Sequence, residues 1–217
     1  MAFRGWPVEA IEFYEGLCAD NSKTYWTANK SVYDEAVRAP MVELLAELEP
    51  EFGPAKIFRP NRDVRFSKDK SPYKTQIAAT LERGGYVKLS AEGLGVGAGA
   101  YMMDGPSLKK FRAAVADDTT GPQLVAIVAT LTKGGIGVST HESLKRVPPG
   151  FPPDHPRADL LRYKDLVAWR DWPVAAWLGT AAAKKRVVDT LRATEPLRDW
   201  LNQAFALPVV DCDVVCQ

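Results

Sequence analysis

Cysteine and histidine are scarce in this sequence of 217 residues, which contains three cysteines and two histidines. The cysteines (Cys18, Cys212 and Cys216) are odd in number and widely spaced, which excludes a disulfide framework. No C-x-x-C, H-x-x-x-H or Asp-rich calcium loop is present, and neither is a Walker A sequence or a G-x-S-x-G elbow. We therefore expect neither a metal ion nor a cofactor.

Long apolar runs are also absent. No segment approaches the roughly 18 consecutive apolar residues of a membrane-spanning helix. The first ten residues, MAFRGWPVEA, lack the apolar region of a signal peptide. We expect a cytoplasmic protein without a membrane partner, and the sequence leaves its oligomeric state open.

An excess of charge of one sign is missing from the whole chain but present in one window. The 28 basic and 27 acidic residues nearly balance, which argues against a dedicated nucleic-acid wrapper. Residues 54–76 nevertheless hold seven Lys or Arg and two Asp, a net charge of +5 that leaves −4 for the remainder. The basic stretch, residues 59–74, is the densest group of chemically capable side chains.

The hydrophobic pattern changes from helical to alternating and back. A helical period covers the N-terminal third up to about Pro50, with a break or kink expected at Pro40. Alternating apolar residues separated by short turns at 82–85 and near 92–93 then predict an antiparallel meander. Helical patterns return after Asp104, and residues 166–169 fit a strand near the sheet edge.

This order of elements predicts the α+β class: an antiparallel sheet of about four to five strands, flanked by N-terminal and C-terminal helices. The length suits a single domain over residues 1–217. Residues 208–217 show no clear period, so we expect a loosely attached tail there.

The basic stretch has three interpretations. Arg side chains suit bidentate contacts with phosphate or carboxylate, and Lys side chains add compact positive charge, so a small-anion site is the first. The second is a non-catalytic module that binds nucleic acid or an acidic protein surface, although nucleic acid is not favoured. In the third, the interleaved Asp63 and Asp69 pair with the cations in a purely structural network.

Two residues are candidates for proton transfer if the protein is an enzyme, which the sequence leaves undecided. Asp63 lies within the basic stretch, and His155 follows Asp154 between two prolines. The competing interpretation of His155 is that it shapes a turn and caps the helix beginning near Arg157, because adjacent side chains rarely face each other. His141 has less in its favour still.

Within a glycine-rich run, residues 93–100, the segment 95–100 formally fits the dinucleotide fingerprint G-x-G-x-x-A. That fingerprint requires a helix that opens within it, whereas these glycines alternate as in a strand. A bare strand face instead permits close packing of a helix or a ligand. We do not expect a nicotinamide cofactor.

Three segments resemble an uncharacterised family, domain of unknown function 2461. The central one is FRPNRDVRFSKDKSPYKTQ (58–76), preceded by NSKTYWTANKSVYDEA (21–36) and followed by LKRVPPGFPPDHPRADLLRYK (144–164). The resemblance covers nearly the whole chain and implies one compact α+β domain. It implies no activity, but it draws attention to residues 21–30, 62–74 and 149–164.

These observations converge on one hypothesis, the binding of a small anionic ligand. The expected ligand-binding residues in the basic stretch and near it are Arg62, Arg65, Lys68, Lys70, Lys74, Asn21, Trp26 and Lys30. The proline-rich loop near His155 is expected to converge on the same site.

Overall fold

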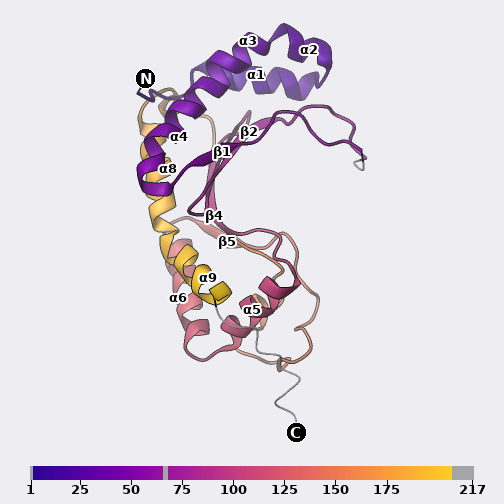
Figure 1. The fold of residues 1–217 in the computed structure, drawn as a ribbon, viewed down its shortest axis with the longest axis vertical. Coiled ribbons are helices and arrows are strands. Elements are labelled where there is room, and N and C mark those ends of the chain that lie inside the picture. The colour runs from indigo at the N-terminus through magenta and orange to yellow at the C-terminus, as the bar shows by residue number, and fades with distance from the viewer. Residues whose placement is uncertain (1, 66–67, 207–217) are drawn as a thin grey trace. The chain divides into compact units, whose positions relative to one another are not determined.

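The structure is a computed structural model that describes residues 2–65 and 68–206. It has the predicted α+β fold, with helices at both ends of the chain (Figure 1). The strands are β1 (Ala55–Ile57), β2 (Gln76–Leu81), β3 (Gly85–Ser90), β4 (Gly93–Ala100), β5 (Gly137–Ser139) and β6 (Leu166–Trp172). They form one antiparallel sheet in the order β1-β2-β3-β4-β6-β5. The described strands exceed the four to five expected because β5, with three residues, is too short to show a period.

The chain divides into two compact units. The first unit contains the residues up to Val96 together with Asp171–Leu191, and the second contains Gly97–Arg170 and the residues from Arg192 onward. Strands β4 and β6 therefore contribute to both units. The expectation of a single domain stays a prediction, and the tail expected at residues 208–217 lies outside the described residues.

Helices and strands of the first unit share one apolar core. Its helices are α1 (Val8–Ala19), α2 (Lys23–Ala28), α3 (Lys30–Val32), the π-helix η1 (Tyr33–Arg38), α4 (Ala39–Phe52), the 3₁₀ helix η2 (Ala176–Gly179) and α8 (Ala182–Ala193). Alternate residues of β2, namely Ile77, Ala79 and Leu81, are buried in a cluster with side chains from α1, α4 and α8. The opposite face of these strands carries half-buried polar side chains such as Gln76 and Thr80.

The kink expected at Pro40 takes the form of a change in helix type. Pro40 lies in the first turn of α4, and the π-helix η1 precedes it. Because proline lacks an N–H group, it cannot complete the hydrogen bond that a continuous α-helix would need here. The wider π turn is a common way to absorb such an interruption. It keeps Tyr33 and Val37 in the core.

The predicted meander is confirmed in β2 and β3. Their antiparallel register runs from Gln76 opposite Ser90 to Leu81 opposite Gly85. Gly84 occupies the turn with a φ of 90°, a conformation that favours glycine. The short turn sets this register and keeps Ile77, opposite Leu89, on the core side.

The second unit contains α5 (Gly105–Ala116), α6 (Thr120–Lys133), α7 (Ala158–Leu161) and α9 (Glu195–Ala206). Phe111, Leu124 and Trp200 lie in its own buried cluster. Arg157 secures the end of α5, because its Nε and Nη2 donate to the carbonyl oxygens of Val115 (2.6 Å) and Ala116 (2.8 Å). In the part of the chain that the structure describes, no helix is both long and apolar enough to cross a membrane.

The alternating glycines allow close approach of a strand. A Cβ atom at Gly97 would lie 2.5 Å from the carbonyl oxygen of Ala168 in β6 and against the ring of Trp169. Gly99 has a φ of 147° and approaches the carbonyl oxygen of Leu166 equally closely. These glycines thus allow close approach of β6, the neighbouring strand in the sheet, whereas the sequence suggested a helix or a ligand packed on the strand face. The run is extended throughout, as expected for a strand and not for a dinucleotide fingerprint.

Candidate functional site

The described part of the basic stretch, residues 59–65 and 68–74, forms a two-stranded projection that we call the arm. Figure 1 shows it extending from β1 and β2 beyond the ends of these strands. The two strands of the arm are joined by hydrogen bonds from the Arg62 N–H to the Pro72 carbonyl (2.9 Å) and from the Lys74 N–H to the Pro60 carbonyl (2.8 Å). Asn61 and Tyr73 form an antiparallel bridge between them. The arm is therefore an ordered continuation of the sheet in its described part.

A bulge separates the arm from the sheet. Ile57 pairs with Ala79, and Asn61 pairs with Tyr73. The first strand therefore advances four residues between these two pairs, from 57 to 61, while the second advances six, from 73 to 79. Two additional residues on one strand bend it and redirect its side chains. At this place the Lys74 Nζ lies 5.2 Å from the centre of the Phe58 ring.

Asn21 and Trp26 hold the base of the arm through Tyr73. The Asn21 side chain both donates to the Tyr73 carbonyl (3.0 Å) and accepts from the Tyr73 N–H (3.1 Å). The indole of Trp26 stacks on the Tyr73 ring, with 4.3 Å between centroids and 9° between planes. The adjacent Ser22 caps α2 by accepting from the Tyr25 N–H, which fixes the position of this segment. The sequence grouped Asn21 and Trp26 with the basic stretch, and both do contact it.

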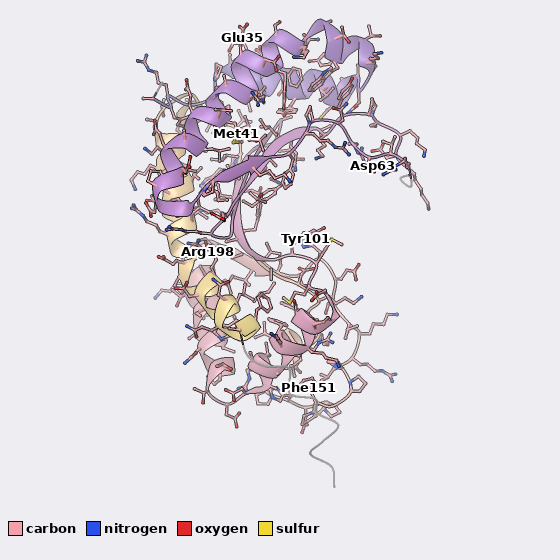
Figure 2. The ribbon with its side chains drawn as sticks, in the orientation of Figure 1. Glu35, Met41, Asp63, Tyr101, Phe151 and Arg198 are labelled. Carbon is pink, nitrogen blue, oxygen red and sulfur yellow. The ribbon has the colours of Figure 1, made fainter. Side chains whose placement is uncertain are left out.

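The outer part of the arm is rich in local ion pairs. Arg65 donates to both carboxylate oxygens of Asp63, at 3.0 and 2.6 Å, and Arg62 pairs with Asp69. Figure 2 shows Asp63 on this outer part. The bonds from Arg65 hold the pKa of the Asp63 carboxyl below its usual value. The hydroxyl and N–H of Ser71, followed by Arg62, hold the pKa of Asp69 well below its usual value.

The remaining cations differ in their surroundings. Lys70 donates to the Val64 carbonyl (2.9 Å), and Lys30 pairs with Asp34 one helical turn away. Among residues 2–65 and 68–206, no carboxylate forms an ion pair with Arg59, Lys68 or Lys74. Lys30 thus contacts its own helical segment. In the described part of the arm, Lys68 and Lys74 have no acidic partner, and Arg59 makes no direct ion pair although its charge helps to lower the pKa of Asp63.

Lys74 is the most unusual of these cations. Burial, and in second place the positive charge of Arg59, lowers the pKa of its ammonium group. The ring beneath it, Phe58, lies 6.2 Å from the Tyr86 ring, and the Tyr86 hydroxyl accepts from Gln76 (3.3 Å). The Lys74 ammonium, two rings and an amide therefore lie close together at the base of the arm, and the charge of Arg59 acts on Lys74. Arg59, Phe58 and Tyr86 were not among the residues predicted for the site, because their proximity depends on strand pairing.

The two histidines, both in the second unit, have opposite arrangements. His155 Nδ1 accepts from the Arg157 N–H (3.0 Å), and its carbonyl accepts from the Ala158 N–H (2.9 Å) at the start of α7. This is the turn-shaping role that competed with proton transfer in the sequence, although Arg157 itself is the N-cap of α7. The backbone N–H and ring Nδ1 of His141 both face one carboxylate oxygen of Asp165, at 2.9 and 3.3 Å. Asp165 is separated from His141 by 24 residues, so no local signal in the sequence identified this pair.

No group of three or more His, Cys, Asp or Glu side chains in the described residues is arranged to hold a metal ion. The convergence of the proline-rich loop on the basic stretch stays a prediction, since the two belong to different units.

Comparison with known proteins identifies a family. The model of a family described as conserved hypothetical protein (DUF2461) matches residues 9–200, which is most of the chain. Among curated proteins and solved structures, none matches the chain. The matched range contains the arm, its contacts with Asn21 and Trp26, and both histidines. The chain therefore belongs to the family of conserved hypothetical proteins DUF2461.

Proposed function

We propose that the protein binds a small anion, a phosphate or carboxylate compound, at the base of the arm. Arg59 and Lys74 are the central groups of the proposed site, and Lys68 and Lys70 strengthen the positive field. Arg62 and Arg65 would join them if the ligand displaced their present partners, Asp69 and Asp63. Asn21 and Trp26 would support the site through Tyr73, while Lys30 lies on a separate helical segment.

One observation carries the proposal: Lys74 is half-buried, it lies near a second cation, and no acidic partner compensates it in the described chain. Such an arrangement disfavours the ammonium form, so an anion that contacted both cations would relieve the cost. Arg62, Arg65 and Lys70 lack this property because carboxylates or a carbonyl already face them, and Lys68 lacks it because its side chain is exposed. A guanidinium and an ammonium also suit phosphate and carboxylate oxygens as donors.

The rings near Lys74 favour a ligand that carries a flat apolar group. The exposed sheet face offers Phe58 and Tyr86, and the Gln76 amide adds a hydrogen-bonding group between strand and arm. Aromatic side chains with a few convergent polar groups are typical of small-molecule sites. A long nucleic acid would instead require a broad exposed cationic surface, whereas several arm cations are neutralised locally.

The direct test is titration calorimetry with inorganic phosphate, citrate and phenyl phosphate, for the parent protein and two matched variants. Lys74→Gln and Lys68→Gln each remove one positive charge from the arm, but only Lys74 is half-buried over a ring. We expect Lys74→Gln to weaken binding about tenfold or more, which is 1.4 kcal/mol, and Lys68→Gln to change it less than about threefold. Equal losses in both variants, together with oligonucleotide binding that disappears at high salt, would refute the site and favour a binding module.

Proton uptake supplies a second readout. In the free protein the lowered pKa of Lys74 leaves part of the group neutral at a pH slightly below its ordinary 10.5. A bound anion favours the ammonium form, so binding should take up protons in that range. Calorimetry at several pH values up to about 10.5, each in two buffers of different ionisation enthalpy, measures this uptake. Binding of phosphate without proton uptake would place the ligand away from Lys74.

A further inference from the structure

The second unit contains an imidazole that is held by a buried carboxylate and remains open to solvent. Asp165 is buried, with 4% of its side chain exposed, whereas the His141 side chain is 58% exposed. Both the His141 N–H and the ring Nδ1 point to the same Asp165 oxygen. A carboxylate can only accept, so Nδ1 carries the proton and Nε2 of the neutral ring has a free lone pair. The backbone bond fixes the ring relative to Asp165 as well.

An exposed aromatic side chain lies beside this imidazole. The Tyr101 ring meets the His141 ring edge-on, with 4.8 Å between their centroids, and 61% of Tyr101 is exposed. The next residue, Met102, is 75% exposed and has a φ of 52°, an unusual conformation for a residue with a side chain. Two large exposed side chains with a strained backbone are more typical of a binding surface than of a loop without function.

We propose that His141 is a general base that activates water toward a small ester of an aromatic alcohol, with Asp165 as its positioning residue. In this reaction Nε2 removes a proton from the water as its oxygen bonds to the ester carbonyl carbon. The bond from that carbon to the aryl oxygen then breaks. The products are a phenolate and a carboxylic acid, which loses its remaining proton to solvent and becomes a carboxylate. The imidazolium ring returns the proton that it took from the water to solvent. Asp165 remains ionised and stabilises the imidazolium ring.

The substrate class follows from the neighbouring groups. The ring of an aryl ester can pack on Tyr101 while its carbonyl carbon lies near Nε2 of His141. A phenolate departs without a separate proton donor, so one oriented base is sufficient for the step. This site uses residues of the second unit alone and does not depend on anion binding by the arm.

His155 provides a matched internal control. Its Nδ1 already accepts from the Arg157 N–H, so the neutral ring carries its proton on Nε2 and has no free basic nitrogen. The two histidines of the chain are thus expected to be opposite tautomers. Nitrogen NMR of the full-length protein at alkaline pH measures this directly, with His141→Ala and His155→Ala assigning the two rings. An Nε2-protonated ring at His141 would overturn the proposal, and this readout does not require any Asp165 variant to fold.

The activity test follows release of 4-nitrophenolate from 4-nitrophenyl acetate by the full-length protein. We expect His141→Ala to lower the rate above buffer about a hundredfold or more, since general-base effects range over about 10²–10⁴, and His155→Ala to leave it unchanged. Asp165→Asn, which keeps the shape but removes the charge, should lower kcat and leave KM within about twofold. Tyr101→Ala should instead raise KM. Equal rates for the parent protein and His141→Ala, equal losses for both histidine variants, or an acetyl group retained on His141 in mass spectrometry would each overturn the general-base role.

Discussion

The two hydrogen bonds between the Asn21 side chain and the Tyr73 backbone make a quantitative prediction. Replacing Asn21 with Ala removes the side-chain acceptor of the Tyr73 N–H (3.1 Å) and the side-chain donor to the Tyr73 carbonyl (3.0 Å). Tyr73 is only 7% exposed. A net contribution of about 0.5–1.5 kcal/mol for each bond predicts a loss of about 1–3 kcal/mol in the free energy of unfolding of the first unit. The Trp26 stack on Tyr73 remains, so the arm should loosen at its base without the core collapsing.

Two measurements separate local loosening from a general loss of stability. Urea unfolding monitored by tryptophan fluorescence gives the free-energy change, and hydrogen exchange at the Arg62 and Lys74 amides reports the bonds between the two strands of the arm. Both amides should exchange faster in Asn21→Ala. Asn202→Ala, a change at an exposed position of α9, serves as the control and should shift stability by no more than about 0.5 kcal/mol. A change below that value in Asn21→Ala, with both amides exchanging as before, would refute the role assigned to Asn21.

Three further predictions concern other parts of the chain. Arg65→Ala should change the melting temperature by no more than about 2 °C, since the Arg65 side chain is 77% exposed and exposed ion pairs contribute about 0–1 kcal/mol. Calorimetric unfolding measures this change. A large drop in melting temperature would favour the structural interpretation of the basic stretch. Gly97→Ala should lower the free energy of unfolding by about 1–3 kcal/mol in urea, because the new Cβ would lie 2.5 Å from the Ala168 carbonyl oxygen. Gly105→Ala is the control, because no atom lies near its Cβ position, and it should not lower this free energy. Similar values for both variants would contradict the close strand packing. The Lys184 ammonium, followed by the Phe3 N–H, holds the pKa of Glu47 below its usual value. The Glu47 carboxylate therefore stabilises the protein above the unfolded-state pKa of about 4.5. This contribution is lost as the pH falls through the lower folded-state pKa of Glu47. Glu47→Gln should therefore lower the melting temperature most at pH 7 and progressively less as the pH falls below about 4.5, and a difference that does not change over this pH range would exclude this linkage.

The sequence was sufficient for the fold class because its signals are local. The alternation of Ile77, Ala79 and Leu81 and the turn at Glu82–Gly84 specify a hairpin without reference to distant residues. Pro40 likewise marks an interruption by its own chemistry, although it does not reveal that the interruption is a π-helix. Strand β5 was missed because three residues cannot establish a period.

The candidate sites were less predictable because they depend on pairing across the chain. Charge alternation within the basic stretch predicted local pairs, and the structure confirms those of Asp63 with Arg65 and Asp69 with Arg62. The position of Lys74 over the Phe58 ring depends on a bulge, and no single residue in the sequence predicts that bulge. The contact of His141 with Asp165 depends on the register of a distant segment, and short-range spacing therefore favoured His155.

The division of the chain into two units has a consequence for its synthesis. The first unit is discontinuous: its last segment, Asp171–Leu191, follows the whole of Gly97–Arg170 in the chain. That late segment supplies the end of β6, which approaches Gly93, and most of α8, whose Val187 and Leu191 lie in the first core. A nascent chain that has just left the ribosome as far as Arg170 therefore cannot bury this core, although all of the arm has already been made. Folding of the arm's supporting unit must wait for residues translated about a hundred positions after the arm itself.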